Sequence, residues 1–74
     1  MIDLSLIRQE ARVTQAEMAT RLSTTQSSVS QLERRDDLRL TTLVDYLNAL
    51  GAEACITVRI GDETYEYNLT GDQH

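Results

Sequence analysis

Residues 14–33 read TQAEMATRLSTTQSSVSQLE, and this stretch decides the fold of the chain. Thr14 and Glu17 form a capping box, in which each side chain satisfies a backbone N–H left unpaired at the start of a helix. A helix is therefore predicted to begin near Gln15. An apolar stripe follows at helical spacing and consists of Met18, Ala19 and Leu22. The next residues favour turns and caps over helix interiors, and they are Ser23, Thr24 and Thr25.

A second helix is predicted directly after this turn. Thr25 is a suitable N-cap, and Val29 and Leu32 lie three residues apart on the face that turns inward. The outward faces carry polar residues, which are Gln26, Ser27, Ser30, Gln31 and Arg34. The stretch is thus predicted to fold as helix, short turn and helix, an arrangement that can lay its second helix in the major groove of DNA.

The same stretch resembles the helix-turn-helix of the XRE family, which includes the repressors and Cro proteins of phages lambda and 434. The shared features are TQAE in the first helix, a small residue where the helices cross, TTQ at the turn and an inward apolar pair, here Ala19, Val29 and Leu32. The resemblance covers about residues 2–51 and implies a lambda-repressor-like DNA-binding domain. Ser23 replaces the usual glycine of the turn, and a side chain at positive φ costs on the order of 1 kcal/mol.

Two further helices are predicted around this unit. The first runs from about Asp3 to Arg12, with an inward stripe of Leu4, Ile7 and Ala11. The other runs from about Thr41 to Leu50 and carries the strongest helical periodicity in the chain, formed by Leu40, Leu43, Val44, Leu47 and Leu50. Gly51 follows at the position of a C′ glycine. The prediction is a mainly α fold with a compact four-helix domain at residues 1–51.

Behind Gly51 the periodicity becomes alternating, which predicts a β-hairpin at residues 52–69. One strand has an apolar face of Ala54, Ile56, Val58 and Ile60, and the other has Tyr65, Tyr67 and Leu69. A two-residue II′ turn at Gly61-Asp62 and a four-residue loop both place these residues on one side. An isolated hairpin is marginal, so this face is expected to pack on its own helices or on a second subunit. The dimerisation candidates are Ile56, Val58, Tyr65 and Tyr67. Residues 70–74 are predicted to be a flexible tail.

Charge is unevenly distributed along the 74 residues, whose formal net charge is −5. Residues 1–40 carry six arginines against six acidic residues, so this half is neutral. Residues 41–74 carry Arg59 against six acidic residues, so all the excess negative charge lies behind the helix-turn-helix. The asymmetry favours two faces with different partners, one tolerating phosphate and one repelling it. Solubility alone is an equally good explanation of the acidic residues.

Composition argues against several other classes of protein. The chain has no apolar run near 18 residues and no signal-peptide pattern, so we expect a cytoplasmic protein without a membrane partner. Cys55, the only cysteine, is expected to be a half-buried strand residue, and His74, the only histidine, is the last residue. No nucleophile–base pair or glycine-rich phosphate loop can be built from this set. We therefore expect no enzyme, cofactor or metal site.

The resemblance also assigns site residues. Gln26, Ser27 and Gln31 match the base-reading positions of the family, and Thr25 is placed to touch a thymine methyl group. Gln15 and Ser28 match phosphate contacts, and Arg39 and Arg35 lie in the link behind the second helix, where they can follow the DNA backbone. Arg8 and Glu33 match a structural ion pair of the 434-type fold.

These residues together predict a homodimeric transcriptional repressor that binds an inverted-repeat operator in double-stranded DNA. Resemblance to the XRE-type antitoxin-repressors HipB and HigA, with the acidic second half, favours an autoregulating antitoxin of a type II toxin–antitoxin pair with a basic toxin partner. A stand-alone phage-type repressor is one alternative. A protein-interaction module that keeps the fold without binding DNA is another, and the net charge of −5 favours it.

Overall fold

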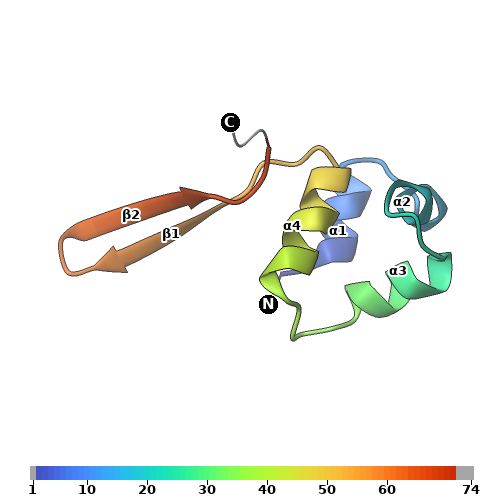
Figure 1. Cartoon of the computed structure of the whole chain (residues 1–74), viewed down its shortest axis with the longest axis horizontal. Helices are drawn as coiled ribbons and strands as arrows, with labels where there is room; N and C mark the ends of the chain where they lie inside the picture. The colour runs from blue at the N-terminus through green and yellow to red at the C-terminus, as the bar shows by residue number, and fades with distance from the viewer. Residues whose placement is uncertain (1, 72–74) are drawn as a thin grey trace.

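The computed structural model describes residues 2–71, which form a helical head and a β-hairpin (Figure 1). The head contains α1 (Leu4–Glu10), α2 (Gln15–Arg21), α3 (Gln26–Glu33) and α4 (Leu40–Ala49). The hairpin contains β1 (Cys55–Ile60) and β2 (Glu63–Asn68). The predicted order of four helices and a hairpin is confirmed.

Side-chain caps start three of the four helices, and the sequence predicts two of them, Thr14 and Thr25. The Thr14 hydroxyl accepts from the Glu17 amide at 3.0 Å, and the Glu17 carboxylate accepts from the Thr14 amide at 3.3 Å, which completes the capping box. Thr25 caps α3 by accepting from the Ser28 amide at 3.1 Å. Asp3 caps α1 in the same way through the Leu6 amide.

Three helices end in the left-handed conformation, although only one of them has a glycine there. The φ angles are 60° at Arg12, 55° at Ser23 and 71° at Gly51. Behind α2, the Thr24 amide donates to the Ala19 carbonyl and the Ser23 amide donates to the Thr20 carbonyl, which is a Schellman motif. Ser23 therefore occupies the strained position that the sequence predicted for it.

The core of the head lies where all four helices meet. Its buried apolar residues are Leu4, Val13, Met18, Ala19, Val29, Tyr46 and Leu47. The expected inward stripe of α1 is shorter than predicted, because Ala11 is the exposed C-cap of a helix that ends at Glu10. In α4 the stripe is rotated: Leu40 is 52% exposed in the first turn, while Tyr46 is fully buried.

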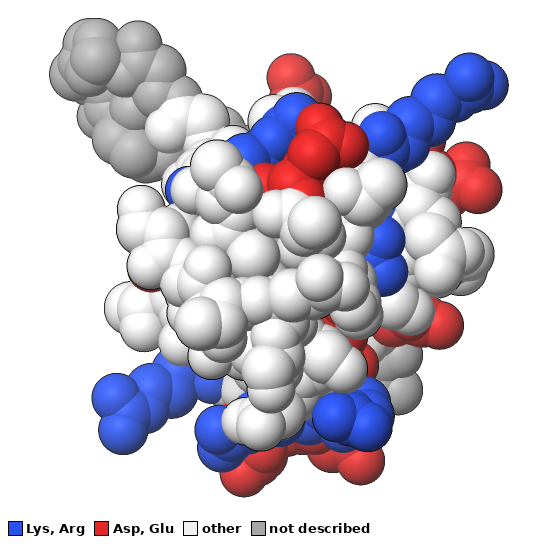
Figure 2. Space-filling model, turned by 90° about the vertical axis from the view of Figure 1, so that its right-hand side faces the viewer, with Lys and Arg blue, Asp and Glu red and all other residues white. Residues whose placement is uncertain are grey.

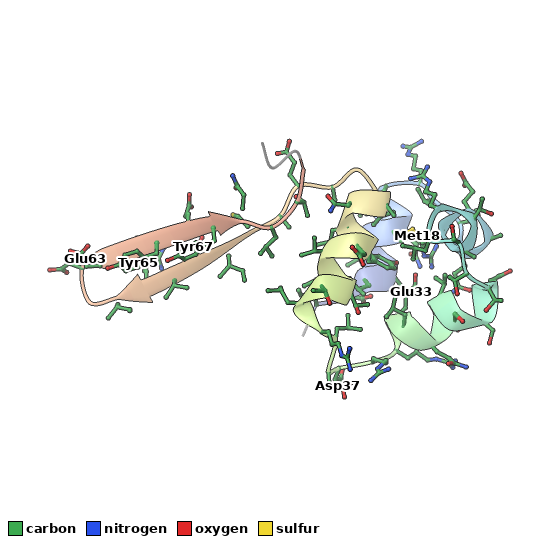
Figure 3. The ribbon with its side chains drawn as sticks, in the orientation of Figure 1. Met18, Glu33, Asp37, Glu63, Tyr65 and Tyr67 are labelled. Atoms are coloured by element: carbon green, nitrogen blue, oxygen red, sulfur yellow. The ribbon has the colours of Figure 1, made fainter. Side chains whose placement is uncertain are left out.

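The hairpin extends away from the head and rests on none of its helices (Figure 1). Its register pairs Val58 with Tyr65 and Ile56 with Tyr67, as the two-residue turn predicts. Gly61 has φ 58° whereas Asp62 is not in the left-handed region, which fits a II′ turn. Every residue of both strands is exposed, and Figure 3 shows Tyr65 and Tyr67 far from the helices.

Of the two alternatives for the apolar face of the hairpin, the structure does not have the one in which this face packs on its own head. The expectation that Cys55 is half-buried is wrong, because Cys55 is exposed. The physical reason is the direction in which the chain leaves α4: the link through Gly51 carries the strands outward, to a molecule 44 Å in its longest extent. The apolar face is left to solvent in the single chain.

Candidate nucleic-acid interface

The α2–α3 unit presents the side chains that the sequence singled out for reading bases. Val29 is completely buried and anchors α3 against the core. On the opposite side of the helix the base-reading candidates are all exposed, and they are Thr25, Gln26, Ser27 and Gln31. The Thr25 hydroxyl is occupied, because it accepts from the Ser28 amide and donates to the Ser28 hydroxyl at 2.9 Å. Its methyl group remains available for an apolar contact.

Figure 2 views the side of the head on which α2 and α3 lie. The centre of this face is uncharged, and arginine side chains lie at its margin with acidic side chains beside several of them. The sequence contains no lysine, so every blue side chain is an arginine. The face is therefore built for hydrogen bonding at its centre, and it has positive charge only at the rim.

Glu33, the last residue of α3, lies between the helices of the head (Figure 3), where it is the centre of a hydrogen-bonded cluster. Arg8 Nε donates to Glu33 Oε2 at 2.7 Å, and Arg8 Nη1 donates to the Val13 carbonyl at 2.8 Å. The Tyr46 hydroxyl donates to Glu33 Oε2 at 2.6 Å. The side chains of Arg8 and Glu33 are only 9% and 5% exposed. One carboxylate thus joins α1, α3 and α4.

The protonation states of this cluster follow from its contacts. Burial acts to raise the pKa of Glu33, but the hydrogen bonds from Arg8, Tyr46 and Gln15 outweigh it and lower that pKa below its ordinary value. The hydrogen bond to Glu33 raises the pKa of Arg8. Burial, together with the Glu33 carboxylate, raises the pKa of Tyr46. At neutral pH Glu33 is ionised and the Tyr46 hydroxyl stays protonated and donates.

The cluster reaches the exposed face through two glutamines. Gln15 Nε2 donates to Glu33 Oε1 at 3.1 Å, which turns Gln15 Oε1 outward. Gln26 Nε2 donates to that oxygen at 3.5 Å. Because a carboxylate can only accept, it selects which end of each amide faces which neighbour. Gln26 keeps its Oε1 and one N–H free for an external partner.

The phosphate-binding candidates lie on both sides of this polar centre. Gln15 is half-buried at the start of α2, and Ser28 is exposed in the first turn of α3. Arg39 is exposed at the N-cap of α4, where it makes no side-chain capping bond. Arg35 is exposed too, but its Nε lies 3.4 Å from the Asp37 carboxylate, which partly neutralises it. Arg39 is the freer of the two cations.

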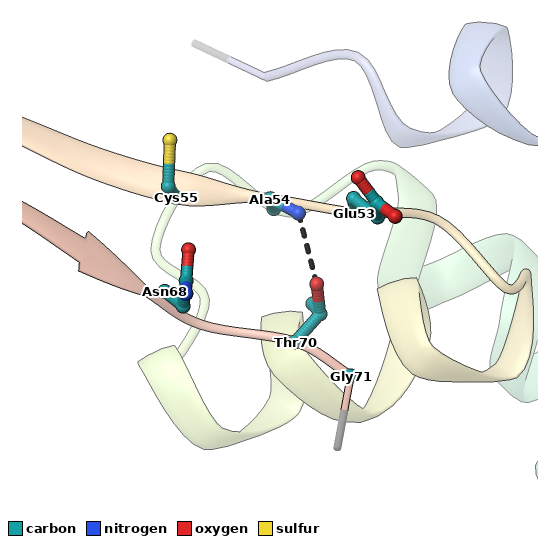
Figure 4. Close-up of a pocket in the computed structure, with 6 residues that line it drawn as sticks. All are labelled: Glu53, Ala54, Cys55, Asn68, Thr70 and Gly71. Atoms are coloured by element: carbon teal, nitrogen blue, oxygen red, sulfur yellow. Dashed lines mark hydrogen bonds between the residues drawn. The ribbon is translucent and has the colours of Figure 1, made fainter. Parts of the chain in front are cut away.

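A small hollow at the root of the hairpin is lined by Glu53, Ala54, Cys55, Asn68, Thr70 and Gly71 (Figure 4). The Ala54 amide donates to the Thr70 hydroxyl at 2.9 Å, and the Gly71 amide donates to Asn48 Oδ1 at 3.0 Å. A flexible tail beginning at residue 70 is therefore wrong for Thr70 and Gly71, and residues 72–74 lie outside the described part. Within residues 2–71 no group of His, Cys, Asp and Glu side chains is arranged to hold a metal ion.

The helix-turn-helix model HTH_3 matches residues 4–55 of this chain. The chain belongs to the helix-turn-helix family. The match ends at the first residue of β1, so nearly all of the hairpin lies outside the part that defines this family. Among residues 2–71 of this helix-turn-helix protein, no helix has the length and apolar content needed to span a membrane.

The individual proteins that are similar to this chain include HigA antitoxins. A protein of Mycobacterium tuberculosis with the provisional name antitoxin HigA2 is 41% identical over 61 residues, which is 80% of this chain and 60% of that relative. The structure is similar to the DNA-bound antitoxin HigA3, with a TM-score of 0.79 and 32% identity, over 100% of this chain and 96% of the other.

A second solved structure of a HigA antitoxin, described as showing DNA bending induced by a unique dimerisation, also has a TM-score of 0.79 and 32% identity. That match covers 90% of this chain and 93% of the other, while the match to the DNA-bound structure covers the hairpin as well as the helices. XRE-type helix-turn-helix and HigA-like architecture are thereby confirmed for this chain.

The sequence prediction missed one important residue of the Glu33 cluster. Tyr46 is completely buried and supplies the shortest contact to the carboxylate. Part of the signal was present, because Leu43, Tyr46, Leu47 and Leu50 follow helical spacing as well as the stripe that starts at Leu40 does. An aromatic residue with a polar end is typical of a buried site that needs one hydrogen-bond donor.

Proposed function

We propose that this protein is a sequence-specific DNA-binding repressor whose α3 enters the major groove. The observation that carries the proposal is the exposed, uncharged polar face of α3. The amide of Gln26 on this face is held by Gln15, which is held in turn by Glu33. Family membership and the DNA-bound solved relative support it. An enzyme is not supported by any arrangement of side chains described above.

In this proposal Gln26, Ser27, Gln31 and Thr25 contact base edges. The free Oε1 and N–H of Gln26 match adenine N6 and N7, so a bidentate contact is expected there. Gln31 lies further along the exposed face of α3 and reads a neighbouring base, and Ser27 adds a short hydroxyl contact. The Thr25 methyl group meets a thymine methyl.

Gln15, Ser28, Arg39 and Arg35 are proposed to contact phosphates and to set the position of α3 in the groove. Gln15 then has two tasks, because its amide also bonds Gln26. With few free cations at the interface, each monomer is expected to bind DNA weakly by charge alone. Affinity must come from using two recognition helices at once.

We therefore propose a homodimer that binds an inverted repeat, with its two α3 helices about 34 Å apart. The apolar face of the hairpin supports this, since Ile56, Val58, Tyr65 and Tyr67 are 38%, 40%, 43% and 57% exposed in the single chain. One of the solved HigA structures is described as showing DNA bending induced by dimerisation, which agrees with the proposal.

The biological role proposed is that of an autoregulating antitoxin in a type II toxin–antitoxin pair. The relatives named as antitoxins support it, and the acidic second half of the chain offers a surface for a basic toxin. Copurification of the protein with a small basic protein encoded beside it tests this role. Recovery of the protein alone would favour a stand-alone repressor instead.

DNA binding itself is tested with the labelled promoter fragment upstream of the protein's own coding sequence. Fluorescence anisotropy at rising salt should give an affinity that falls with a shallow slope, because the few arginines that contact phosphates release few counterions. A scrambled fragment of the same length should bind more weakly at every salt concentration. Equal affinity for the two fragments, or no binding at low salt, would instead support a protein-interaction module on this fold.

A further inference from the structure

The two outer edges of the hairpin are not equivalent. The Leu69 amide donates to the Ala54 carbonyl at 2.9 Å, so these two residues form a hydrogen-bonded pair. Hydrogen-bonded and non-hydrogen-bonded pairs alternate along an antiparallel ladder. The non-hydrogen-bonded pairs are therefore Cys55 with Asn68, Thr57 with Glu66 and Arg59 with Thr64. Backbone N–H and C=O groups of these six residues point outward and are free to pair with another strand.

The side chains at these positions differ in charge between the two edges. The β1 edge presents Cys55, Thr57 and Arg59. The β2 edge presents Thr64, Glu66 and Asn68, with Glu63 in the same strand. When a strand pairs with its own copy across a two-fold axis, its middle residue lies opposite itself. Full overlap of two β1 edges puts Thr57 opposite Thr57, whereas full overlap of two β2 edges puts Glu66 opposite Glu66.

We propose that the edge of β1 is the dimerisation edge, and that two chains pair there antiparallel with Thr57 on the two-fold axis. This inference rests on the homodimer proposed above and specifies how it is built. The hairpins then form one four-stranded sheet in the order β2, β1, β1 of the partner and β2 of the partner. Two directly facing threonines are a favourable cross-strand pair, while two facing carboxylates are unfavourable.

This register also matches the apolar side chains. Ile56 of one protomer lies opposite Val58 of its partner, and Ile60 lies opposite Ala54. These are non-hydrogen-bonded pairs of the new ladder, in which side chains approach most closely. Arg59 lies opposite Cys55, so the two arginines stay apart. The apolar faces of both hairpins end up on one side of a sheet of four strands, which is more stable than a lone hairpin.

The β2 strands become the outer edges of the dimer. Each carries Glu63 and Glu66, and charged residues on a free edge hinder further strand addition. The distribution of charge therefore explains both why one edge pairs and why the assembly stops at two chains.

Site-directed cross-linking tests the register. In a Cys55→Ser background, Thr57→Cys places the only thiol on the two-fold axis, where the Cα atoms are about 5.5 Å apart and a disulfide can form. Mild oxidation should convert most of this variant into a covalent dimer on denaturing gels. Glu66→Cys in the same background is the matched control, because Glu66 is the cross-strand neighbour of Thr57 in the hairpin and both residues are exposed. It should cross-link at least about tenfold more slowly.

The wild-type chain provides a second control. Its Cys55 lies opposite Arg59 in this register, so the two Cys55 Cα atoms are roughly 13 Å apart and should not cross-link. Rapid cross-linking of wild-type Cys55, or of Glu66→Cys at the rate of Thr57→Cys, would overturn the proposed edge or register.

Light scattering on the uncross-linked proteins separates this inference from the proposed function. A monomer at high protein concentration would contradict the homodimer itself. A dimer in which Thr57→Cys does not cross-link would leave the homodimer standing and place its interface elsewhere, which would also overturn the β1 edge.

Discussion

The helical head and the hairpin differ in whether their apolar side chains are covered within the single chain. In the head, buried Val29, Tyr46 and Met18 fix the helices, and the Glu33 cluster leaves no buried side-chain polar atom unpaired among the described residues. In the hairpin, no strand residue is buried. The head is complete within one chain, whereas the hairpin has an apolar face that only another molecule can cover. A region that reads DNA needs a fixed shape within each protomer. A region that pairs with a second protomer needs an apolar surface that its own chain does not cover.

The largest effect is expected when the Glu33 cluster of the head loses one of its charged partners. Arg8→Ala leaves the Glu33 carboxylate nearly buried without its cation, and we expect a loss of about 3–5 kcal/mol in the free energy of unfolding, measured by urea denaturation. The double variant Arg8→Met/Glu33→Leu removes both charges and should recover part of that loss. Equal destabilisation in both variants would show that the unmatched charge is not the cause.

The next effect concerns the hairpin alone. Ile56→Ser with Val58→Ser removes apolar surface from both protomers, so the dimer dissociation constant should rise at least about 100-fold in sedimentation experiments. The helical content by circular dichroism should not change, because the hairpin rests on no helix. Thr64→Ser, on the polar face of the hairpin, is the control and should dimerise normally. A loss of helical content in the double variant would contradict the separation of the two regions.

A smaller effect is expected at the exposed face of α3 that we propose reads DNA. Gln26→Ala with Gln31→Ala should weaken operator binding about 30-fold and leave binding to a scrambled fragment unchanged. Gln9→Ala, an exposed glutamine of α1, is the matched control and should bind as the wild type does. If the double variant kept its affinity and its preference for the operator, α3 would not be the recognition helix.

The smallest expected effect is an increase in the stability of the head. Ser23 has φ 55°, so Ser23→Gly should raise the free energy of unfolding by about 1 kcal/mol, measured by urea denaturation. Thr24→Gly, one residue later and outside the left-handed region, should lower it instead. This pair of results would show that relief of local backbone strain is enough to stabilise the head. The dissociation constant of the dimer should not change in Ser23→Gly.

Local signals in the sequence predicted most of the head. The capping box at Thr14, the cap at Thr25 and the turn at Ser23 each depend on neighbours within a few residues, and all three occur in the structure. Alternation of side chains restricted the hairpin to two even registers, and the structure has the one with the two-residue turn. The left-handed Arg12 was not, since no glycine marks it and the core holds Val13 in place.

The positions of Tyr46 and of the hairpin depended on contacts between distant segments. Tyr46 is buried because Glu33 and Leu4, from two other helices, meet its hydroxyl at 2.6 and 3.3 Å. Periodicity in α4 alone left two stripes open, one of them starting at Leu40. Whether the hairpin covers the head depends on the direction in which the chain leaves Gly51, which no alternation of side chains encodes.

The sequence by itself determined which segments are helical, which two strands pair, and which polar residues α3 exposes, because each of these follows from contacts between near neighbours. Only the tertiary structure decided that Glu33 gathers Arg8, Tyr46 and Gln15 into one cluster, and that the apolar side of the hairpin faces solvent. These outcomes require elements far apart in the chain to meet or to miss one another, and the packing of the whole head sets those distances.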